Sequence, residues 1–201
     1  MAQTITRKGT FDSCHRVLNE KMKCFNIHGH TYLYQLTFKF DSVEDIGYAI
    51  DFKEIKRIAC QWIDDCLDHG TILNHKDFLL FHAVKMTKSK MWIMTLNGAN
   101  EYCNPTVENI AKEVFLAVDI LMSGIKGLRL HKVKIHETPN CFTVCKRKSI
   151  TTDEGNNFHR WRYAEIHKYK LDKGKIEYDD RKAKPSDGDS PGIGAIPEHS
   201  G

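Results

Sequence analysis

The sequence lacks the features that mark membrane-embedded and secreted proteins. Among its 201 residues, no window approaches the roughly 18 consecutive apolar residues of a membrane-spanning helix. Its first residues contain no apolar signal-peptide core, and its seven cysteines include no Cys-x-x-Cys pair. We therefore expect a cytoplasmic protein with reduced thiols and no membrane partner.

A large excess of one charge is also lacking. With 30 basic and 26 acidic residues, the net charge is +4 when the histidines are neutral, which is too small to indicate a nucleic-acid partner. A mild positive excess suits a small phosphorylated anion instead. Hydrophobic residues at 41% and charged residues at 28% are typical of a globular protein, and the length suffices for one domain with an appendage.

The most informative segment that is present contains Cys24 and two histidines, His28 and His30, and it follows a third histidine, His15. In an extended strand, His28 and His30 point from the same face because they stand two residues apart. Neutral imidazole is a preferred zinc ligand, and three protein ligands leave a fourth position open for water or substrate. Cys24 is near enough to act on a molecule bound there. The alternative is a reactive cysteine beside scattered surface histidines.

Two segments near the N-terminus predict a β-hairpin. Residues 3–12 and 31–40 both alternate in the manner of strands, and the second is rich in β-branched and aromatic residues. Antiparallel pairing of the two brings His15 back toward His28 and His30, because all three lie near the same end of the hairpin.

Two helices are predicted downstream. The first begins with Asp51 as its N-cap and ends at about Leu67, with apolar residues at alternating spacings of three and four. The second begins after the Asn-Pro-Thr sequence at 104–106 and ends at Gly124 or Gly127.

Two further strands are predicted at 128–138 and 141–148, which gives the order ββααββ. The segment 70–103 is expected to be irregular, with 91–96 as a possible extra strand. We expect one domain over residues 1–150 and a C-terminal extension over 151–201. Of this extension, 181–201 is expected to be disordered because it is rich in proline and glycine. The part before it could be a docked extension, an interaction segment or a solvated arm, and its composition favours the arm.

Four acidic or imidazole residues, at three places in the chain, are further candidates for chemistry. Asp68 can fix the tautomer of the adjacent His69, although a helix C-terminus also explains a histidine there. Glu137, at the end of a strand, can accept two parallel hydrogen bonds from the amidine-like edge of a guanine or pterin, or simply form a salt bridge. Glu108 most simply complements the dipole of the second helix.

In their order along the chain, these groups resemble the 6-pyruvoyl-tetrahydropterin synthase family over roughly residues 4–148. The motifs are Phe11-x-x-x-His15-Arg16, Cys24-x-x-x-His28-Gly29-His30, Gly47-Tyr48-Ala49-Ile50-Asp51-Phe52, Leu67-Asp68-His69, Asn104-Pro105-Thr106-x-Glu108 and Glu137-Thr138. The three residues between Cys24 and His28 are similar to the branch that forms 6-carboxy-5,6,7,8-tetrahydropterin in queuosine biosynthesis. Pyruvoyl-forming members usually have a longer gap.

The resemblance implies an α+β tunnelling fold (T-fold), in which antiparallel ββααββ sheets, each with two helices on one face, close into a barrel between subunits. It implies a homo-oligomer, expected to be a hexamer of two stacked trimers, whose active sites lie between subunits. The roles it implies are zinc ligands for His15, His28 and His30, general base for Cys24, relay for Asp68 and His69, pterin anchor for Glu137, and further substrate contacts for Thr106 and Glu108.

The implied substrate is 7,8-dihydroneopterin triphosphate, which the carboxy-forming branch converts into 6-carboxytetrahydropterin, acetaldehyde and triphosphate with Zn²⁺. Two alternatives stay open: a pyruvoyl-type triphosphate lyase that keeps the carbon skeleton, and a non-catalytic zinc-binding module. The long stretch between Asp68-His69 and Asn104-Pro105, and the extension after Lys148, depart from the compact family pattern. They leave substrate preference and oligomer size open.

Overall fold

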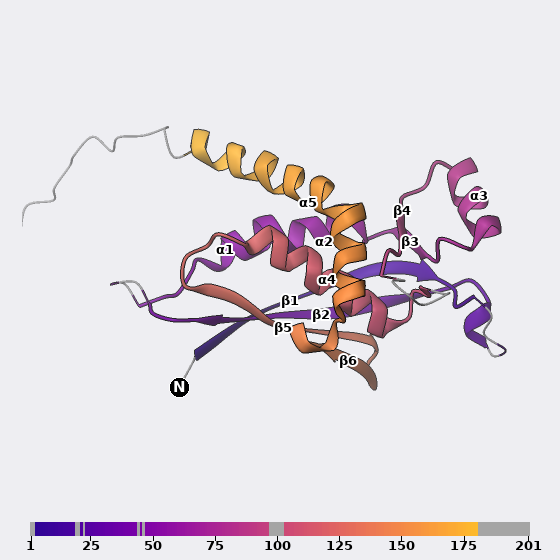
Figure 1. Cartoon of the computed structure of the whole chain (residues 1–201), viewed down its shortest axis with the longest axis horizontal. Coiled ribbons are helices and arrows are strands. Elements are labelled where there is room, and N and C mark those ends of the chain that lie inside the picture. The colour runs from indigo at the N-terminus through magenta and orange to yellow at the C-terminus, as the bar shows by residue number, and fades with distance from the viewer. Residues whose placement is uncertain are drawn as a thin grey trace, which may run out of the picture.

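A computed structural model describes residues 3–18, 21, 23–43, 45, 47–96 and 103–180. Its centre is a curled, half-barrel sheet of six strands in the order β4-β3-β1-β2-β5-β6. The strands are β1 Gln3–His15, β2 His28–Phe40, β3 Gly70–Leu73, β4 Met91–Ile93, β5 Leu128–Thr138 and β6 Cys141–Cys145. The helices are α1 Phe52–Ile55, α2 Gln61–Cys66, α3 Phe78–Met86, α4 Val107–Met122 and α5 Thr152–Asp180 (Figure 1).

The predicted β1–β2 hairpin is confirmed and is longer than expected. The two strands pair antiparallel, and the register continues to His15 opposite His28, so all three histidines belong to regular strands. Alternation places both side chains of every second pair in the core: Phe11 and Tyr32 lie opposite each other, are at most 1% exposed, and stack with ring centroids 4.9 Å apart. The hairpin is thereby fixed in register, because a slip by one residue would turn this face outward.

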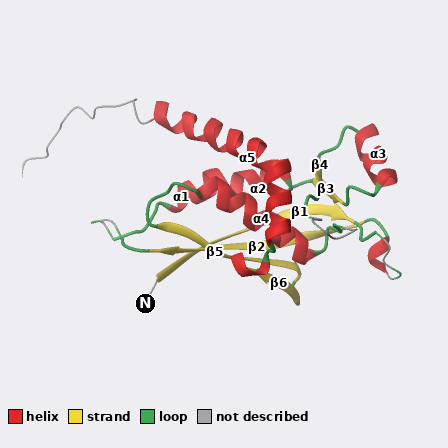
Figure 2. Cartoon of the chain, in the orientation of Figure 1, coloured by secondary structure: helices red, strands yellow, loops and turns green. Residues whose placement is uncertain are grey.

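Both predicted helices are present and cover one face of the sheet (Figure 2). The first runs from α1 through a π-helical stretch at Lys56–Cys60 into α2, and the Asp51 side chain caps it by accepting a hydrogen bond from the Lys53 N–H at 2.8 Å. The apolar face of α4 is buried as predicted. It consists of Ile110, Val114, Val118 and Leu121.

The sheet is mixed, which corrects the prediction of a purely antiparallel ββααββ sheet. The segment 70–103, expected to be irregular, supplies β3 and β4 with α3 between them, and β3 pairs parallel with β1 at residues 13–15. β4 is shorter than the suggested strand at 91–96. β3 is buried at Thr71, Ile72 and Leu73, so it lacks the alternation by which a strand is recognised, and β4 has only three residues.

Helix α5 corrects the preference for a solvated arm. Figure 1 shows it rising beside α4 and continuing over the first helix. Phe158 and Ile166 are fully buried, and the Lys112 ammonium donates to the Glu154 carboxylate at 2.6 Å. The extension is therefore docked on the helical layer as far as its side chains are described. The expectation of disorder over 181–201 concerns residues outside the described part.

Within the described residues, no helix combines the length and apolar character needed to cross a membrane.

Candidate metal centre and its surroundings

Three imidazoles meet where β1 ends and β2 begins. His15 lies opposite His28 in the hairpin register, and His30 lies opposite Ser13, so the alternation of the strands turns all three rings toward the same face. One ring nitrogen from each residue lies within 4.8 Å of the others, and the ring centroids are 4.5 to 5.2 Å apart. Such a group could hold a metal ion, and it uses the three residues predicted from the sequence.

The hydrogen bonds around these rings suit metal binding. His15 Nδ1 lies 2.7 Å from the carbonyl oxygen of Pro105, and His28 Nδ1 lies 2.8 Å from that of Asn26. A carbonyl only accepts, so each Nδ1 carries the proton and each Nε2 keeps a free lone pair. Metal-binding histidines are held by this kind of outer contact.

His15 gives the sharpest indication that an ion fits here. Its Nε2 is buried and has no hydrogen-bond partner, which would be costly for a polar atom that has no function. Burial lowers the pKa of His15 to about 4 and, more weakly, lowers the pKa of His30. Both rings are therefore neutral near pH 7, which is the state that a metal ion requires.

Glu137 borders this group from the end of β5. Its Oε1 lies 3.8 Å from His15 Nε2 and 3.9 Å from His30 Nε2. With both rings neutral, these are polar contacts rather than ion pairs. The Glu137 carboxylate thus borders the group of three histidines.

Cys24 lies in a short turn at Lys23–Phe25 and is exposed. Among the described residues, the ligand atoms close enough to share an ion belong to the three histidines, and the Cys24 thiol is outside that group. Its carbonyl oxygen accepts a hydrogen bond from the Val17 N–H at 2.8 Å, which ties the turn to the residues that follow His15.

Asp68 and His69 form a second cluster between α2 and β3. Asp68 Oδ2 lies 2.5 Å from His69 Nδ1, and its Oδ1 accepts the Asp12 N–H at 2.7 Å. His69 adopts a left-handed conformation, with φ of 53°, and its own N–H donates to the Asp12 carbonyl at 2.7 Å. The hydrogen bond from the imidazole to Asp68 raises the pKa of His69, whose side chain is 79% exposed.

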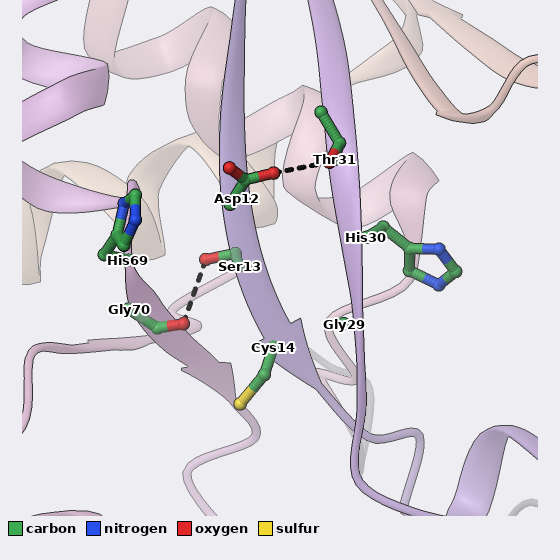
Figure 3. Close-up of a pocket in the computed structure, with 8 residues that line it drawn as sticks. All are labelled: Asp12, Ser13, Cys14, Gly29, His30, Thr31, His69 and Gly70. Carbon is green, nitrogen blue, oxygen red and sulfur yellow. Dashed lines mark hydrogen bonds between the residues drawn. The ribbon is translucent and has the colours of Figure 1, made fainter.

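The two clusters lie on opposite sides of the sheet. A cavity of about 410 Å³ is lined by His69, Asp12 and Cys14, together with Ser13, Gly29, His30, Thr31 and Gly70 (Figure 3). Asp12 and Cys14 alternate with Ser13 and His15 along β1, so they face the other side. Figure 3 shows His69 on one side of the β1–β2 pair and the His30 ring projecting from the other. One chain thus supplies the triad on one face and the pair on the other.

The Asn-Pro-Thr sequence before α4 supports the triad in a way that was not predicted. Pro105 holds His15, and the Asn104 amide pairs with Leu18, accepting its N–H at 2.9 Å and donating to its carbonyl at 3.0 Å. Thr106 is the N-cap residue of α4 without a side-chain cap hydrogen bond, and Glu108 is exposed in the first turn. From the sequence, this segment was predicted only to begin a helix and to contact the substrate.

Comparison with known proteins agrees with the order of motifs. The model of the family described as 6-pyruvoyl tetrahydropterin synthase matches residues 4–148. A 6-carboxy-5,6,7,8-tetrahydropterin synthase of Rickettsia felis is 32% identical over 138 residues, covering 68% of this chain and 95% of the relative. A 6-pyruvoyl tetrahydrobiopterin synthase of Dictyostelium discoideum is 30% identical over 156 residues, covering 72% and 97%.

Solved structures share the fold. An uncharacterized protein of Wolinella succinogenes aligns with a TM-score of 0.58 at 18% identity, over 73% of this chain and 99% of the other. The 6-pyruvoyl tetrahydropterin synthase of Caenorhabditis elegans aligns with a TM-score of 0.51 at 24% identity, over 73% and 96%. On the evidence of its motifs, its family match and its relatives, the chain belongs to the 6-pyruvoyl tetrahydropterin synthase family.

Proposed function

We propose that this protein is a zinc-dependent 6-carboxy-5,6,7,8-tetrahydropterin synthase. It would convert 7,8-dihydroneopterin triphosphate and one water molecule into 6-carboxytetrahydropterin, acetaldehyde and triphosphate. The observation that carries the proposal is the cluster of three histidines with an unpartnered, buried His15 Nε2, preceded by Cys24 at the short spacing. The Rickettsia relatives, which carry this name, support the choice of branch.

His15, His28 and His30 are the residues that would hold zinc. When bound, the ion supplies a Lewis acid that acidifies the C–H bonds next to the substrate's side-chain hydroxyls. The protein residues around it have separate tasks. Cys24 serves as the base that moves the proton, and its position outside the group of ligand atoms suits this role.

Glu137 would anchor the pterin. An ionised carboxylate can accept two parallel N–H bonds from the amidine edge of the ring, which is a charge-assisted and geometrically specific pairing. The Glu137 carboxylate lies 3.8 and 3.9 Å from two of the histidines, so a pterin ring bound to it would lie next to the metal site. We assign Thr106 and Glu108, at the start of α4, to further contacts with the substrate.

Asp68 and His69 would complete the site of a neighbouring subunit. Since His69 lies on the other side of the β1–β2 pair from the His30 ring, a shared site lets both clusters act on one substrate. β4 and β6 end the sheet, and an exposed edge can pair with another chain. We therefore propose a homo-oligomer in which sheets close a barrel between subunits, with a hexamer of two trimers as the expected form. The catalytic machinery would lie within residues 1–150.

The alternative within the family is a pyruvoyl-type lyase, and it is supported by the Dictyostelium relative, which is 30% identical to this chain. Incubating the purified protein with dihydroneopterin triphosphate separates the two. Acetaldehyde together with a 6-carboxypterin product supports the proposal. Triphosphate release without acetaldehyde, with all three side-chain carbons retained, would replace it by the alternative. A Cys24→Ser variant with full turnover would instead exclude the assigned base.

A further inference from the structure

A buried ion pair links helix α3 to the residues just after His15. Both the Nε and an Nη of Arg16 donate to the carboxylate of Asp77, and the two side chains are only 14% and 2% exposed. Asp77 also caps α3 by accepting the Leu80 N–H at 3.1 Å. A paired, bidentate contact of this kind is geometrically specific, and removing one partner leaves an uncompensated charge.

The same arginine reaches the turn that carries Cys24. Its guanidinium lies 5.3 Å from the centre of the Phe25 ring, within the range of a cation–π contact. The next residue, Val17, donates its N–H to the Cys24 carbonyl. Arg16 thus holds Phe25 through its ring, and Val17 holds Cys24 through its backbone.

We propose that Asp77 and Arg16 are positioning residues that hold the Cys24 turn against the triad. Helix α3 would then be a support for the active site, although it belongs to the long segment that departs from the compact family pattern. This inference rests on the proposed function, because Cys24 has to act on the substrate for its placement to affect turnover. The pair lies outside the group of possible ligand atoms, so we assign it a positioning role and no part in the chemistry.

Asparagine at position 77 isolates this role. It is also a good N-cap residue, so Asp77→Asn keeps an acceptor for Leu80 and removes the charge that orients Arg16. Asp41→Asn is the matched control. Asp41 also accepts a bidentate contact, from the two Nη atoms of Arg129, but that pair is exposed, at 53% and 63%, and lies at the start of β5, away from the turn.

The experiment measures three quantities on the zinc-loaded protein: amide hydrogen exchange over residues 17–28, kcat with KM, and zinc content. For Asp77→Asn we expect exchange in the turn to be faster and kcat to fall about 10- to 100-fold, as a misplaced catalytic group can cause, with KM changed much less. Zinc content should be unchanged. Asp41→Asn should match the wild type in all three.

Two further variants keep the inference open to contradiction. Phe25→Leu removes only the ring under Arg16, at a position 43% exposed, so folding is safe; it should shift exchange and kcat in the same direction, less strongly. Arg16→Lys combined with Asp77→Asn should be no worse than either change alone, because residues that act as a unit are not additive.

Unchanged amide exchange in the turn of a folded Asp77→Asn protein would overturn the inference. Loss of zinc from this variant would also overturn it, because the ion pair would then support the histidine triad and not the turn. Full turnover of Cys24→Ser would contradict the proposed function separately. The exchange measurement would still show whether the ion pair holds the turn.

Discussion

The histidine triad and the Asp68–His69 pair are two imidazole clusters in one sheet, and their surroundings make them chemically opposite. Burial keeps His15 neutral and leaves its Nε2 without a partner. His69 is exposed, and its carboxylate partner favours the protonated form. The three histidines could hold a cation, and we propose that the Asp68–His69 pair carries a proton. The surroundings of these histidines, and not the residue type, therefore decide which protonation state each one favours.

The largest effect should come from breaking the triad. His28→Ala removes one of three ligands, so zinc retention and turnover should both be lost, because two imidazoles leave the coordination incomplete. Zinc per subunit, measured by elemental analysis after purification, checks this. His159→Ala, on the exposed face of α5, is the control and should retain zinc. Full zinc occupancy in the His28→Ala protein would contradict the assignment of His28 as a zinc ligand.

Changes in the residues that we propose to move protons should affect turnover without affecting the metal. Cys24→Ala should be inactive and His69→Ala slower by ~10²–10⁴-fold, as is typical for loss of a general acid–base group. Both should purify with zinc. Turnover and zinc content measured on the same samples test this, and a metal-free Cys24→Ala protein would make the cysteine a ligand.

Glu137→Gln should have a smaller effect, mainly on substrate binding. The amide keeps the shape but loses the charge that strengthens two hydrogen bonds, each worth about 1.5–3 kcal/mol. KM should therefore rise more than kcat falls, with zinc unchanged. Steady-state kinetics give the answer, and a loss of zinc would show that the carboxylate, at 3.8 Å from His15, supports the metal instead.

The subtlest difference should appear on titration of the metal-free protein. The pKa of His15 is about 4 in the folded protein. As the pH falls from 6.5, His15 therefore takes up a proton in the unfolded chain before it does so in the folded protein. His15 should therefore make unfolding easier between pH 6.5 and 4, by about 3 kcal/mol at most. His69, whose pKa is raised, acts in the opposite sense, and its contribution is lost as the pH rises. Histidine NMR titration should place the two midpoints on opposite sides of 6.5.

The sequence allowed prediction of the parts of the molecule that depend on local patterns. Alternation along β1 and β2, with the spacing of His28 and His30, was sufficient for the hairpin and the triad. β3 and α5 could not be predicted in this way. β3 is a four-residue strand whose parallel pairing with β1 is non-local, and α5 is a charged segment that docks through Phe158 and Ile166, eight residues apart.

The opposite faces of the two clusters also escaped prediction from the residues alone. Asp68 and His69 were recognised as a pair, but their direction depends on the Asp12 backbone, which holds both residues against the edge of β1. The motif order indicated which residues matter, and the sheet determines which of them can meet within one chain.

A complementation test asks whether the triad of one subunit works with the Asp68–His69 pair of another. Cys24→Ala and His69→Ala subunits, each inactive or slow alone, are co-expressed with different tags and the mixed oligomers are isolated. If the site is shared, interfaces that join an intact Cys24 to an intact His69 regain full function. Random mixing in a closed ring then predicts roughly a quarter of wild-type activity. Mixed oligomers no more active than the separate variants would contradict the account.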